Sequence, residues 1–415
     1  MMKSVRPSTV SGALAAPGSK SYAQRAIAAA LLAKGRSVLH GLTWCDDVRA
    51  ALGVARALGA TADVTGSTAT LNGGFAPRSA ELHCGEAGLG LRMFTPIAAL
   101  HDQDLTITGE GSLLTRPVHM LAGPLIALGA QFSATNGCAP VRVRGPLQGG
   151  RAEVDGSISS QMLTGLLLAL PLAANDTCLQ VRDLKSKPYI DMTLAVMADF
   201  GVTAEHTDFR EFRIPGRQSY QPREYHVEGD WSGAACLLAA GAIGGTVSLT
   251  GLSPASAQAD REVLLALERC GARIAWQNHV LTVAKGGLRA FEFDATNCPD
   301  LFPALAALAA HCTGSTVLRG ASRLTHKESD RASVLQEQFG RLGVCIELDG
   351  DSMTIRGGPV ADGEIDACND HRIAMAGATI AVAAAGPVAI QDTECVAKSY
   401  PGFFADFAQL LAKPH

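Results

Sequence analysis

The stretch PGSKSYAQR, from Pro17 to Arg25, places side chains that can bind anions immediately before the apolar run AIAAALLA. Lys20 and Arg25 are cations, and Ser21 offers a hydroxyl, at the start of the predicted helix. Helix N-termini bind anions because they carry free backbone N–H groups and the positive end of the helix dipole. Chains usually place acidic residues in a first helical turn, so cations there suggest that a ligand requires them.

Five further stretches repeat this design, with a short polar or glycine-rich head before an Ala-rich apolar body. They read CGEAGLGLRMF, GSISSQMLTG, GDWSGAACLL, CPDLFPALAAL and CNDHRIAMAG. Cations outnumber acids in these heads and their adjoining loops, and a substrate with several phosphate and carboxylate charges would explain the excess. The candidate residues are Lys20, Ser21, Arg25, Arg92, Arg116, Ser159, Ser160, Gln161, Lys185, Ser186, Lys187, Tyr189, Asp300, Lys327, Glu328, Arg331, Asp370, His371, Arg372 and Lys398.

Each candidate also has a simpler interpretation. A single Lys or Arg at a helix start is more often a solvated surface charge, and the serines of GSISSQ are equally compatible with helix caps. Asp300 and Asp370 could be caps as well. Glu328 could serve only to pair with Arg331 three residues later, and His371 is as compatible with a packed core histidine as with an acid or base. The functional hypothesis therefore rests on the whole set.

The elements that must position these residues also recur. Helix-like segments end at Gly59, Gly129, Gly201, Gly271 and Gly343, at intervals of 70, 72, 70 and 72 residues. Between them lie the apolar bodies and alternating stretches typical of strands, such as SVLHGL and TVSLTG. Six units of about seventy residues each predict strand, buried helix, strand, amphipathic helix and further strands, which is an α/β fold. Helices that are apolar all round must lie inside layers of other elements.

Composition and charge narrow the class of protein. A chain of 415 residues suggests two or three domains, and a net charge of -4 argues against a nucleic-acid or anionic-membrane surface. The start MMKSVRPSTV lacks the apolar core of a signal peptide, so we expect a cytoplasmic protein. The 11 cysteines are scattered without a CxxC motif and are expected to be reduced. Phosphate-loop and metalloprotease motifs do not occur, and no apolar run reaches the length of a membrane span.

Taken in order, PGSKSYAQR, RPVHML, DGSISSQMLTG, SKPYIDMTL, HKESDR, NDHRIAMA and AKSYPGFF resemble the signature segments of the 5-enolpyruvylshikimate-3-phosphate (EPSP) synthase family, over about Pro17 to Phe404. The resemblance implies an inverse α/β prism, with two domains each of three repeated β-α-β-α-β-β units around buried helices. Residues 18–228 would form the domain on the shikimate 3-phosphate side, and residues 1–17 plus 229–415 the second. The active site would lie in the interdomain cleft.

The resemblance also implies an activity. The family transfers the enolpyruvyl group of phosphoenolpyruvate to the 5-hydroxyl of shikimate 3-phosphate and releases phosphate, in the shikimate pathway of chorismate and aromatic amino acid biosynthesis. It implies no cofactor and no metal, and these two small molecules as substrates. We expect a monomer without nucleic-acid or membrane partners.

The residue roles that the resemblance implies fall into three groups. We expect Asp300 to act as the base towards the hydroxyl and Glu328, helped by Lys20, as the acid towards the methylene of phosphoenolpyruvate. Shikimate 3-phosphate would be bound by Ser21, Arg25, Ser159, Ser160, Gln161, Ser186, Tyr189 and Lys327. Phosphoenolpyruvate would be bound by Lys20, Gly88, Arg116, Gln161, Arg331, Arg372 and Lys398.

One loop departs from the family pattern. Where the family usually has GNAGTAMRP, this chain has GEAGLGLRM, which brings Glu86, Leu89 and Met93 beside the expected phosphoenolpyruvate site. Glyphosate resembles phosphoenolpyruvate, so the departure predicts reduced sensitivity to it. Two alternatives to EPSP synthase activity remain open from the sequence. They are the sister enzyme that transfers enolpyruvate to UDP-N-acetylglucosamine and a non-catalytic, phosphate-sensing binding protein. The sister enzyme usually has AKN where this chain has Ser19-Lys20-Ser21. In a phosphate-sensing protein, the carboxylates of Asp300 and Glu328 would only weaken anion binding.

Overall fold

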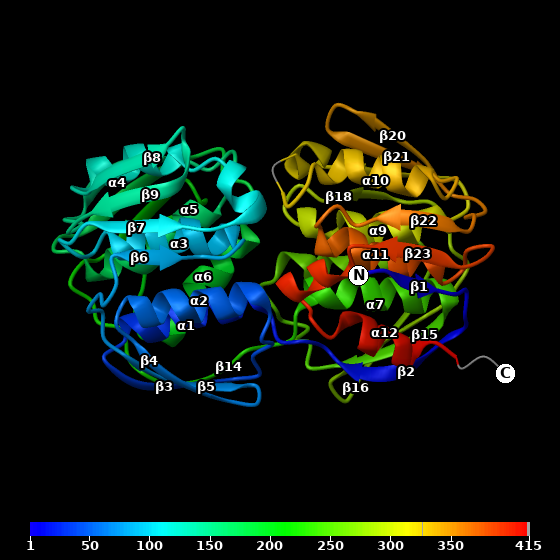
Figure 1. Cartoon of the computed structure of the whole chain (residues 1–415), viewed down its shortest axis with the longest axis horizontal. Coiled ribbons are helices and arrows are strands. Elements are labelled where there is room, and N and C mark those ends of the chain that lie inside the picture. The colour runs from blue at the N-terminus through cyan, green and yellow to red at the C-terminus, as the bar shows by residue number, and fades with distance from the viewer. Residues whose placement is uncertain (326, 413–415) are drawn as a thin grey trace. The chain divides into compact units, whose positions relative to one another are not determined.

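Two units make up the chain in the computed structural model, which describes residues 1–325 and 327–412 (Figure 1). Unit 2 is the continuous stretch Gly18–Val227. Unit 1 combines Met1–Pro17 with the chain from Glu228 onward. Both units alternate helices and strands, so the protein is of the mixed α/β class that the repeat pattern predicts. In the described part of the chain, no helix is both long and apolar enough to cross a membrane.

Unit 2 contains three sheets of four strands each over its described residues. In spatial order they are β14(Glu224–His226)-β3(Gly35–His40)-β5(Thr68–Gly73)-β4(Thr61–Thr65), β6(Glu81–His83)-β7(Leu105–Thr108)-β9(Cys138–Arg144)-β8(Gln131–Thr135), and β10(Gly150–Asp155)-β11(Thr177–Arg182)-β13(Glu211–Ile214)-β12(Glu205–Thr207).

Unit 1 contains two sheets of four strands and one of three, counted over the described residues. The sixth repeat differs from the expected pattern, because the place of a closing hairpin is taken by the N-terminal strand β1, which pairs antiparallel with β23. The sheets are β16(Arg273–Gln277)-β17(Val280–Ala284)-β15(Gly245–Thr250)-β2(Val10–Ala15), β18(Glu292–Asp294)-β19(Ser315–Arg319)-β21(Ser352–Arg356)-β20(Cys345–Asp349), and β1(Lys3–Val5)-β23(Val388–Gln391)-β22(Gly363–Asp366).

Each sheet contains one parallel pair of strands. Parallel neighbours need a crossover connection, and in β6–β7, β10–β11, β18–β19 and β22–β23 the apolar helix of the repeat supplies it. In the other two sheets the strands before and after the apolar helix do not pair with each other. β2 and β3 flank α1, and β14 and β15 flank α7, but β14 pairs with β3 and β2 pairs with β15. The chain therefore passes from one unit to the other twice, after Pro17 and after Val227.

The apolar helices form the cores of the units. Residues Ala26–Leu31 are completely buried, and in unit 2 α3 packs closely on α5. Gly165 permits this contact, because a Cβ there would lie 2.8 Å from the carbonyl oxygens of Arg92 and Met93. In unit 1, α9 packs against both α7 and α11. These helices are α1(Lys20–Leu32), α3(Gly88–Ala98), α5(Gln161–Ala169), α7(Trp231–Gly244), α9(Phe302–Ala310) and α11(His371–Ala381).

The second helix of each repeat is shorter or only partly buried. These helices are α2(Asp46–Ala57), α4(Ala122–Ala127), α6(Pro188–Asp199), α8(Val263–Arg269), α10(Arg331–Gly340) and α12(Phe403–Leu410). The five repeat glycines lie two or three residues beyond the first five, with φ between +79° and +117°. That left-handed conformation favours glycine and ends the helix. The predicted helix ends are therefore confirmed.

Candidate active site

The polar heads follow the carboxyl ends of parallel neighbouring strands. β10 and β11 end in register at Asp155 and Arg182, and Ser160 and Ser186 lie in the loops that follow. The backbone N–H of Lys185 donates to the carbonyl of Gly156 at 3.2 Å, which joins the two loops. Crevices at the carboxyl ends of parallel strands are common ligand sites. Three other parallel pairs are followed by candidate residues in the same way. Gly88 and Arg116 follow β6 and β7, Asp300 and Lys327 follow β18 and β19, and Arg372 and Lys398 follow β22 and β23.

In unit 2, two guanidinium groups meet above Gly88. A Cβ at Gly88 would lie 2.7 Å from Arg116 Nη1 and 3.3 Å from Arg92 Nη1. Arg92 Nη1 donates to Gln161 Oε1 at 2.7 Å, and Arg92 Nη2 donates to the Pro117 carbonyl at 2.9 Å. We call Gly88, Arg92, Arg116 and Gln161 the Gly88 cluster. Only a residue without a side chain leaves the space above these cations open to a ligand.

Arg25 is a buried cation held by neutral oxygens. Its Nε donates to Thr193 Oγ1 at 2.9 Å, its Nη1 to the Ser21 carbonyl at 2.8 Å and its Nη2 to the Tyr189 carbonyl at 3.1 Å. Burial lowers the pKa of Arg25 to about 10. Since each of these acceptors is uncharged, the fixed guanidinium can still attract an anion.

Lys20 has a carboxylate partner that the sequence analysis missed. Its Nζ donates to Asp47 Oδ2 at 2.8 Å, and both side chains are largely buried. Asp47 lies in the first turn of α2, where an acidic residue is favourable. The pair therefore offsets the unfavourable position of Lys20 in the first turn of α1.

The serines of unit 2 lie in two strained or capped loops. Ser159 Oγ accepts a hydrogen bond from the Gln161 backbone N–H at 3.2 Å. Ser186 has a φ of +55°, which is unfavourable for a residue with a side chain and is typical of functional sites. Its carbonyl accepts from the Tyr189 N–H at 3.1 Å. Lys187 is exposed above the Phe209 ring, 5.6 Å from its centre.

In unit 1, Asp300 is surrounded by three cations. Its Oδ1 accepts from Lys327 Nζ at 3.3 Å and from Arg331 Nη1 at 3.0 Å, while its Oδ2 accepts from Arg372 Nη2 at 3.1 Å. Burial opposes ionisation of Asp300, but attraction by Arg372, Lys327 and Arg331 outweighs it and holds the pKa well below its usual value. Asp300 lies in the short 3-10 segment Pro299–Leu301 and makes no cap hydrogen bond to α9, so the cap interpretation of this residue is wrong.

Arg331 connects the acids of this site. Its side chain is completely buried, with Nε donating to Asp370 Oδ2 at 2.9 Å and Nη2 to Glu328 Oε2 at 2.7 Å. Burial opposes the charge, yet Asp370, Glu328 and Asp300 raise the pKa of Arg331 above its usual value. Asp370 also caps α11 by accepting from the Arg372 N–H at 3.0 Å. The simpler interpretations of Asp370 as a helix cap and of Glu328 as a partner of Arg331 are therefore confirmed.

Asp260 of unit 1 is another acid that the sequence analysis missed. Asp260 lies in the 3-10 segment Ala259–Glu262, is 2% exposed and accepts a hydrogen bond from Ser232 Oγ. Burial, and then the negative charge of Asp300, raise the pKa of Asp260 to about 6. Burial also lowers the pKa of Lys327, the cation paired with Asp300, against the attraction of that carboxylate.

Most of the arginines and lysines predicted for the site are buried, and Lys187 is the exposed exception among the described candidates. His371 is buried as well, in agreement with a packed core position. Burying a charge is costly unless partners or a ligand compensate it. The exposed fractions are 1% for Arg25, 7% for Arg116, 0% for Arg331, 5% for Arg372 and 6% for Lys398.

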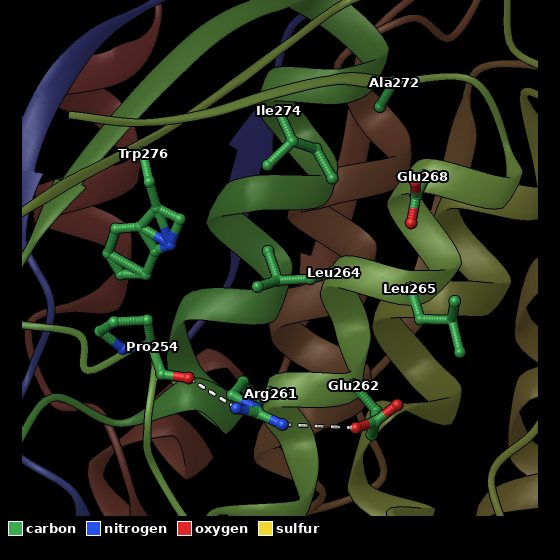
Figure 2. Close-up of a pocket in the computed structure, with 9 residues that line it drawn as sticks. All are labelled: Pro254, Arg261, Glu262, Leu264, Leu265, Glu268, Ala272, Ile274 and Trp276. Carbon is green, nitrogen blue, oxygen red and sulfur yellow. Dashed lines mark hydrogen bonds and ion pairs between the residues drawn. The ribbon is translucent and has the colours of Figure 1, made fainter.

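A pocket elsewhere in unit 1 contains none of the predicted site residues. It has a volume of about 650 Å³ and lies against α8 and β16 (Figure 2). Leu264, Leu265, Ile274 and Trp276 form its apolar wall, and Arg261 at its edge donates to the Pro254 carbonyl. Glu262 and Glu268 also line it, and Arg261 pairs with Glu262, so the groove combines an apolar wall with a charged edge.

Comparisons with known proteins agree on one family. The family model described as EPSP synthase (3-phosphoshikimate 1-carboxyvinyltransferase) matches residues 5–407. The 3-phosphoshikimate 1-carboxyvinyltransferase of Methanoculleus marisnigri is 40% identical, over 95% of this chain and 96% of the relative. The 3-phosphoshikimate 1-carboxyvinyltransferase of Klebsiella pneumoniae is 39% identical, over 97% of this chain and 96% of the relative.

Solved structures agree with these relatives. The EPSP synthase of Acinetobacter baumannii superposes with a TM-score of 0.84 at 27% identity, covering 99% of this chain and 98% of the other. The enolpyruvyl transferase NikO of Streptomyces tendae superposes with a TM-score of 0.78 at 21% identity, covering 99% of this chain and 97% of the other. At this identity the likeness shows the shared fold alone.

Proposed function

Since the chain belongs to the EPSP synthase (3-phosphoshikimate 1-carboxyvinyltransferase) family and has that activity, we propose that the clusters of the two units act together on phosphoenolpyruvate and shikimate 3-phosphate. The reaction moves the enolpyruvyl group of phosphoenolpyruvate to the 5-hydroxyl of shikimate 3-phosphate and releases phosphate. The observation that carries the proposal is the Asp300 carboxylate, held by Lys327, Arg331 and Arg372.

Phosphoenolpyruvate has two anionic groups that suit the buried cations. In our proposal Arg331, Arg372 and Lys398 of unit 1 bind it together with Lys20 and the Gly88 cluster of unit 2. Arginine guanidinium groups match carboxylate and phosphate oxygens in pairs, which supports this assignment. When the substrate takes over these cations, Asp300 loses part of the attraction that keeps its pKa low. Substrate binding would thus make Asp300 a stronger base.

Shikimate 3-phosphate is assigned to the remaining donors. Ser159, Ser160 and Ser186 would bind its phosphate, since their loops lie at the carboxyl ends of β10 and β11. The ring would be bound by Ser21, Arg25, Gln161, Tyr189 and Lys327.

The chemistry then needs one base and one acid. Asp300 removes the proton of the 5-hydroxyl, while Glu328, helped by Lys20, protonates the methylene carbon of phosphoenolpyruvate. The central carbon becomes cation-like and accepts the hydroxyl oxygen, which gives a tetrahedral adduct. Loss of a methyl proton and cleavage of the bond between that carbon and the phosphate oxygen then release phosphate and the enol ether, with the proton roles reversed.

Three further features belong to the proposal. The element order supports six β-α-β-α-β-β units arranged as two inverse α/β prisms, with the exception noted for the sixth sheet. A reducing, cytoplasmic compartment is supported by the 11 cysteines, all of which are free. A monomer stays a prediction.

The test is phosphate release from phosphoenolpyruvate, measured with shikimate 3-phosphate and separately with UDP-N-acetylglucosamine. We expect release only with the first. Asp300→Asn and Glu328→Gln should each lower kcat about 10²- to 10⁴-fold and leave the Kd of shikimate 3-phosphate nearly unchanged.

Asp294→Asn is the matched control, because Asp294 is an exposed carboxylate on β18, six residues before Asp300. It should keep the parental kcat. Release with UDP-N-acetylglucosamine would favour the sister enzyme. Tight phosphate binding without release from either acceptor would favour a phosphate-sensing protein, and a normal kcat in Asp300→Asn would contradict the assigned base.

A further inference from the structure

A cluster of metal-ligating side chains lies on the parallel pair β3–β14 of unit 2. His40 and His226 are direct partners in this pair, and their rings stack with centres 4.6 Å apart and planes 20° apart. Glu224 precedes His226 by two residues, so its side chain lies on the same face of the strand. Its Oε1 is 2.7 Å from His40 Nε2. We call these three residues the His40 cluster.

We propose that the His40 cluster binds one divalent transition-metal ion of the zinc type. Two imidazoles and one carboxylate suit Zn²⁺, Ni²⁺ or Cu²⁺, whereas Mg²⁺ and Ca²⁺ prefer oxygen ligands throughout. Each residue offers one ligand atom, and these atoms all lie within 4.8 Å of one another.

The ligand atoms need only a small adjustment. A tetrahedral zinc ion with bonds of about 2.0 Å separates its ligand atoms by about 3.3 Å. Glu224 and His226 are exposed, so their side chains can turn towards the ion without displacing packed atoms. The fourth position of the ion would face solvent and hold water.

The surroundings of His40 favour ligation by Nε2. Its Nδ1 is 3.2 Å from Thr68 Oγ1 on β5, the neighbouring strand of the same sheet. A metal on Nε2 leaves the proton on Nδ1, which then donates to the Thr68 hydroxyl and fixes the ring orientation. An exposed His–Glu ion pair alone would contribute little and would not need His226.

The position of the cluster gives binding a measurable consequence. β14 has three residues, forms the edge of its sheet and pairs with β3. The Val227 N–H donates to the His40 carbonyl at 2.9 Å, immediately before the chain leaves unit 2. An ion bound to both strands holds this edge in place, and an ion that binds the folded state stabilises it.

The experiment titrates ZnCl₂ into the full chain, without an added histidine tag, by calorimetry and by thermal unfolding with and without EDTA. We expect one zinc ion per chain and a rise in Tm of about 3 °C at a zinc concentration 100-fold above Kd. Co²⁺ should give the visible absorption of tetrahedral coordination. His226→Ala and Glu224→Gln should abolish the Tm rise and weaken binding at least tenfold.

His83→Ala is the matched control. His83 ends β6, which pairs in parallel with β7 as β14 does with β3, but its partner there is Thr108. This variant should bind zinc like the parent chain. The proposal is overturned if the parent binds no zinc below about 100 μM. It is equally overturned if His226→Ala and His83→Ala change zinc binding to the same extent.

Discussion

Replacing Asp260 by Asn should stabilise the protein at neutral pH, because the fold buries this carboxyl where its charge is unfavourable. Asp260 is 2% exposed. Burial, and then the negative charge of Asp300, raise its pKa from 3.8 to about 6, although Arg372 and the hydrogen bond from Ser232 act in the opposite direction. The structure thus holds a proton more tightly than the unfolded chain does.

The magnitude follows from the shift. A difference of about 2 pKa units corresponds to about 3 kcal/mol between the two protonation states. A group whose pKa is raised by folding binds more protons in the folded state, so its contribution to stability falls as pH rises from about 4 to about 6. Asn stays neutral and still offers Ser232 an acceptor. The variant should therefore exceed the parent by up to about 3 kcal/mol at pH 7.5 and by little at pH 4.

Urea unfolding followed by circular dichroism, at pH 4, 5, 6 and 7.5, measures this difference. Asp294→Asn again serves as control, because its expected effect on the free energy of unfolding has the opposite sign. The exposed Asp294 carboxylate accepts hydrogen bonds from Thr296, which lower its pKa, so its removal should cost stability at pH 7.5. Equal stabilities of parent and Asp260→Asn at pH 7.5 would refute the reasoning, as would an advantage that persists unchanged at pH 4.

Three further substitutions test the proposed substrate contacts. Gly88→Ala should raise the KM for phosphoenolpyruvate roughly 10- to 100-fold, because its Cβ would displace Arg116 Nη1, 2.7 Å away; an unchanged KM would contradict the Gly88 cluster. Glu86→Asn should lower the inhibition constant of glyphosate, since it removes a negative charge from the adjoining loop; a sub-micromolar inhibition constant of the parent would contradict the predicted reduced sensitivity. Arg25→Lys should raise the KM for shikimate 3-phosphate and lower the urea midpoint, because an ammonium group cannot reach all the acceptors of the guanidinium; parental values of both would exclude the assigned role.

The repeat was predictable because its signals are local. A helix that ends before Gly59 or Gly271 needs a left-handed residue at that point, and the apolar helix bodies are long enough to be recognised by composition alone. The sequence therefore predicts the alternation of strands and helices in every repeat. The structure adds that the sixth repeat closes its sheet with β1 in place of a hairpin.

Strand pairing between repeats could not be predicted from such signals. β2 pairs with β15, and β14 pairs with β3, across about 180 to 240 residues of chain. Their sequences have the same alternation as strands that pair within one repeat, so nothing local specifies the exchange. Only the resemblance to the family implied that the N-terminal strand belongs with the later repeats.

The two acids that the sequence analysis missed, Asp47 and Asp260, occupy a recurring position of the repeat. The predicted site contained other acids but not Asp47 and Asp260. Within their own units, Asp47 pairs with Lys20 and the charge of Asp260 acts on Arg372. Yet one position in the segment that follows the second strand of each repeat recurs at intervals of 67 to 74 residues. It is occupied by Asp47, Arg116, Ser186, Asp260, Lys327 and Lys398. A buried cation needs a compensating charge whenever no anionic ligand is bound. Carboxylates at the same repeat position are therefore expected wherever a site must hold its cations ready for an anionic substrate.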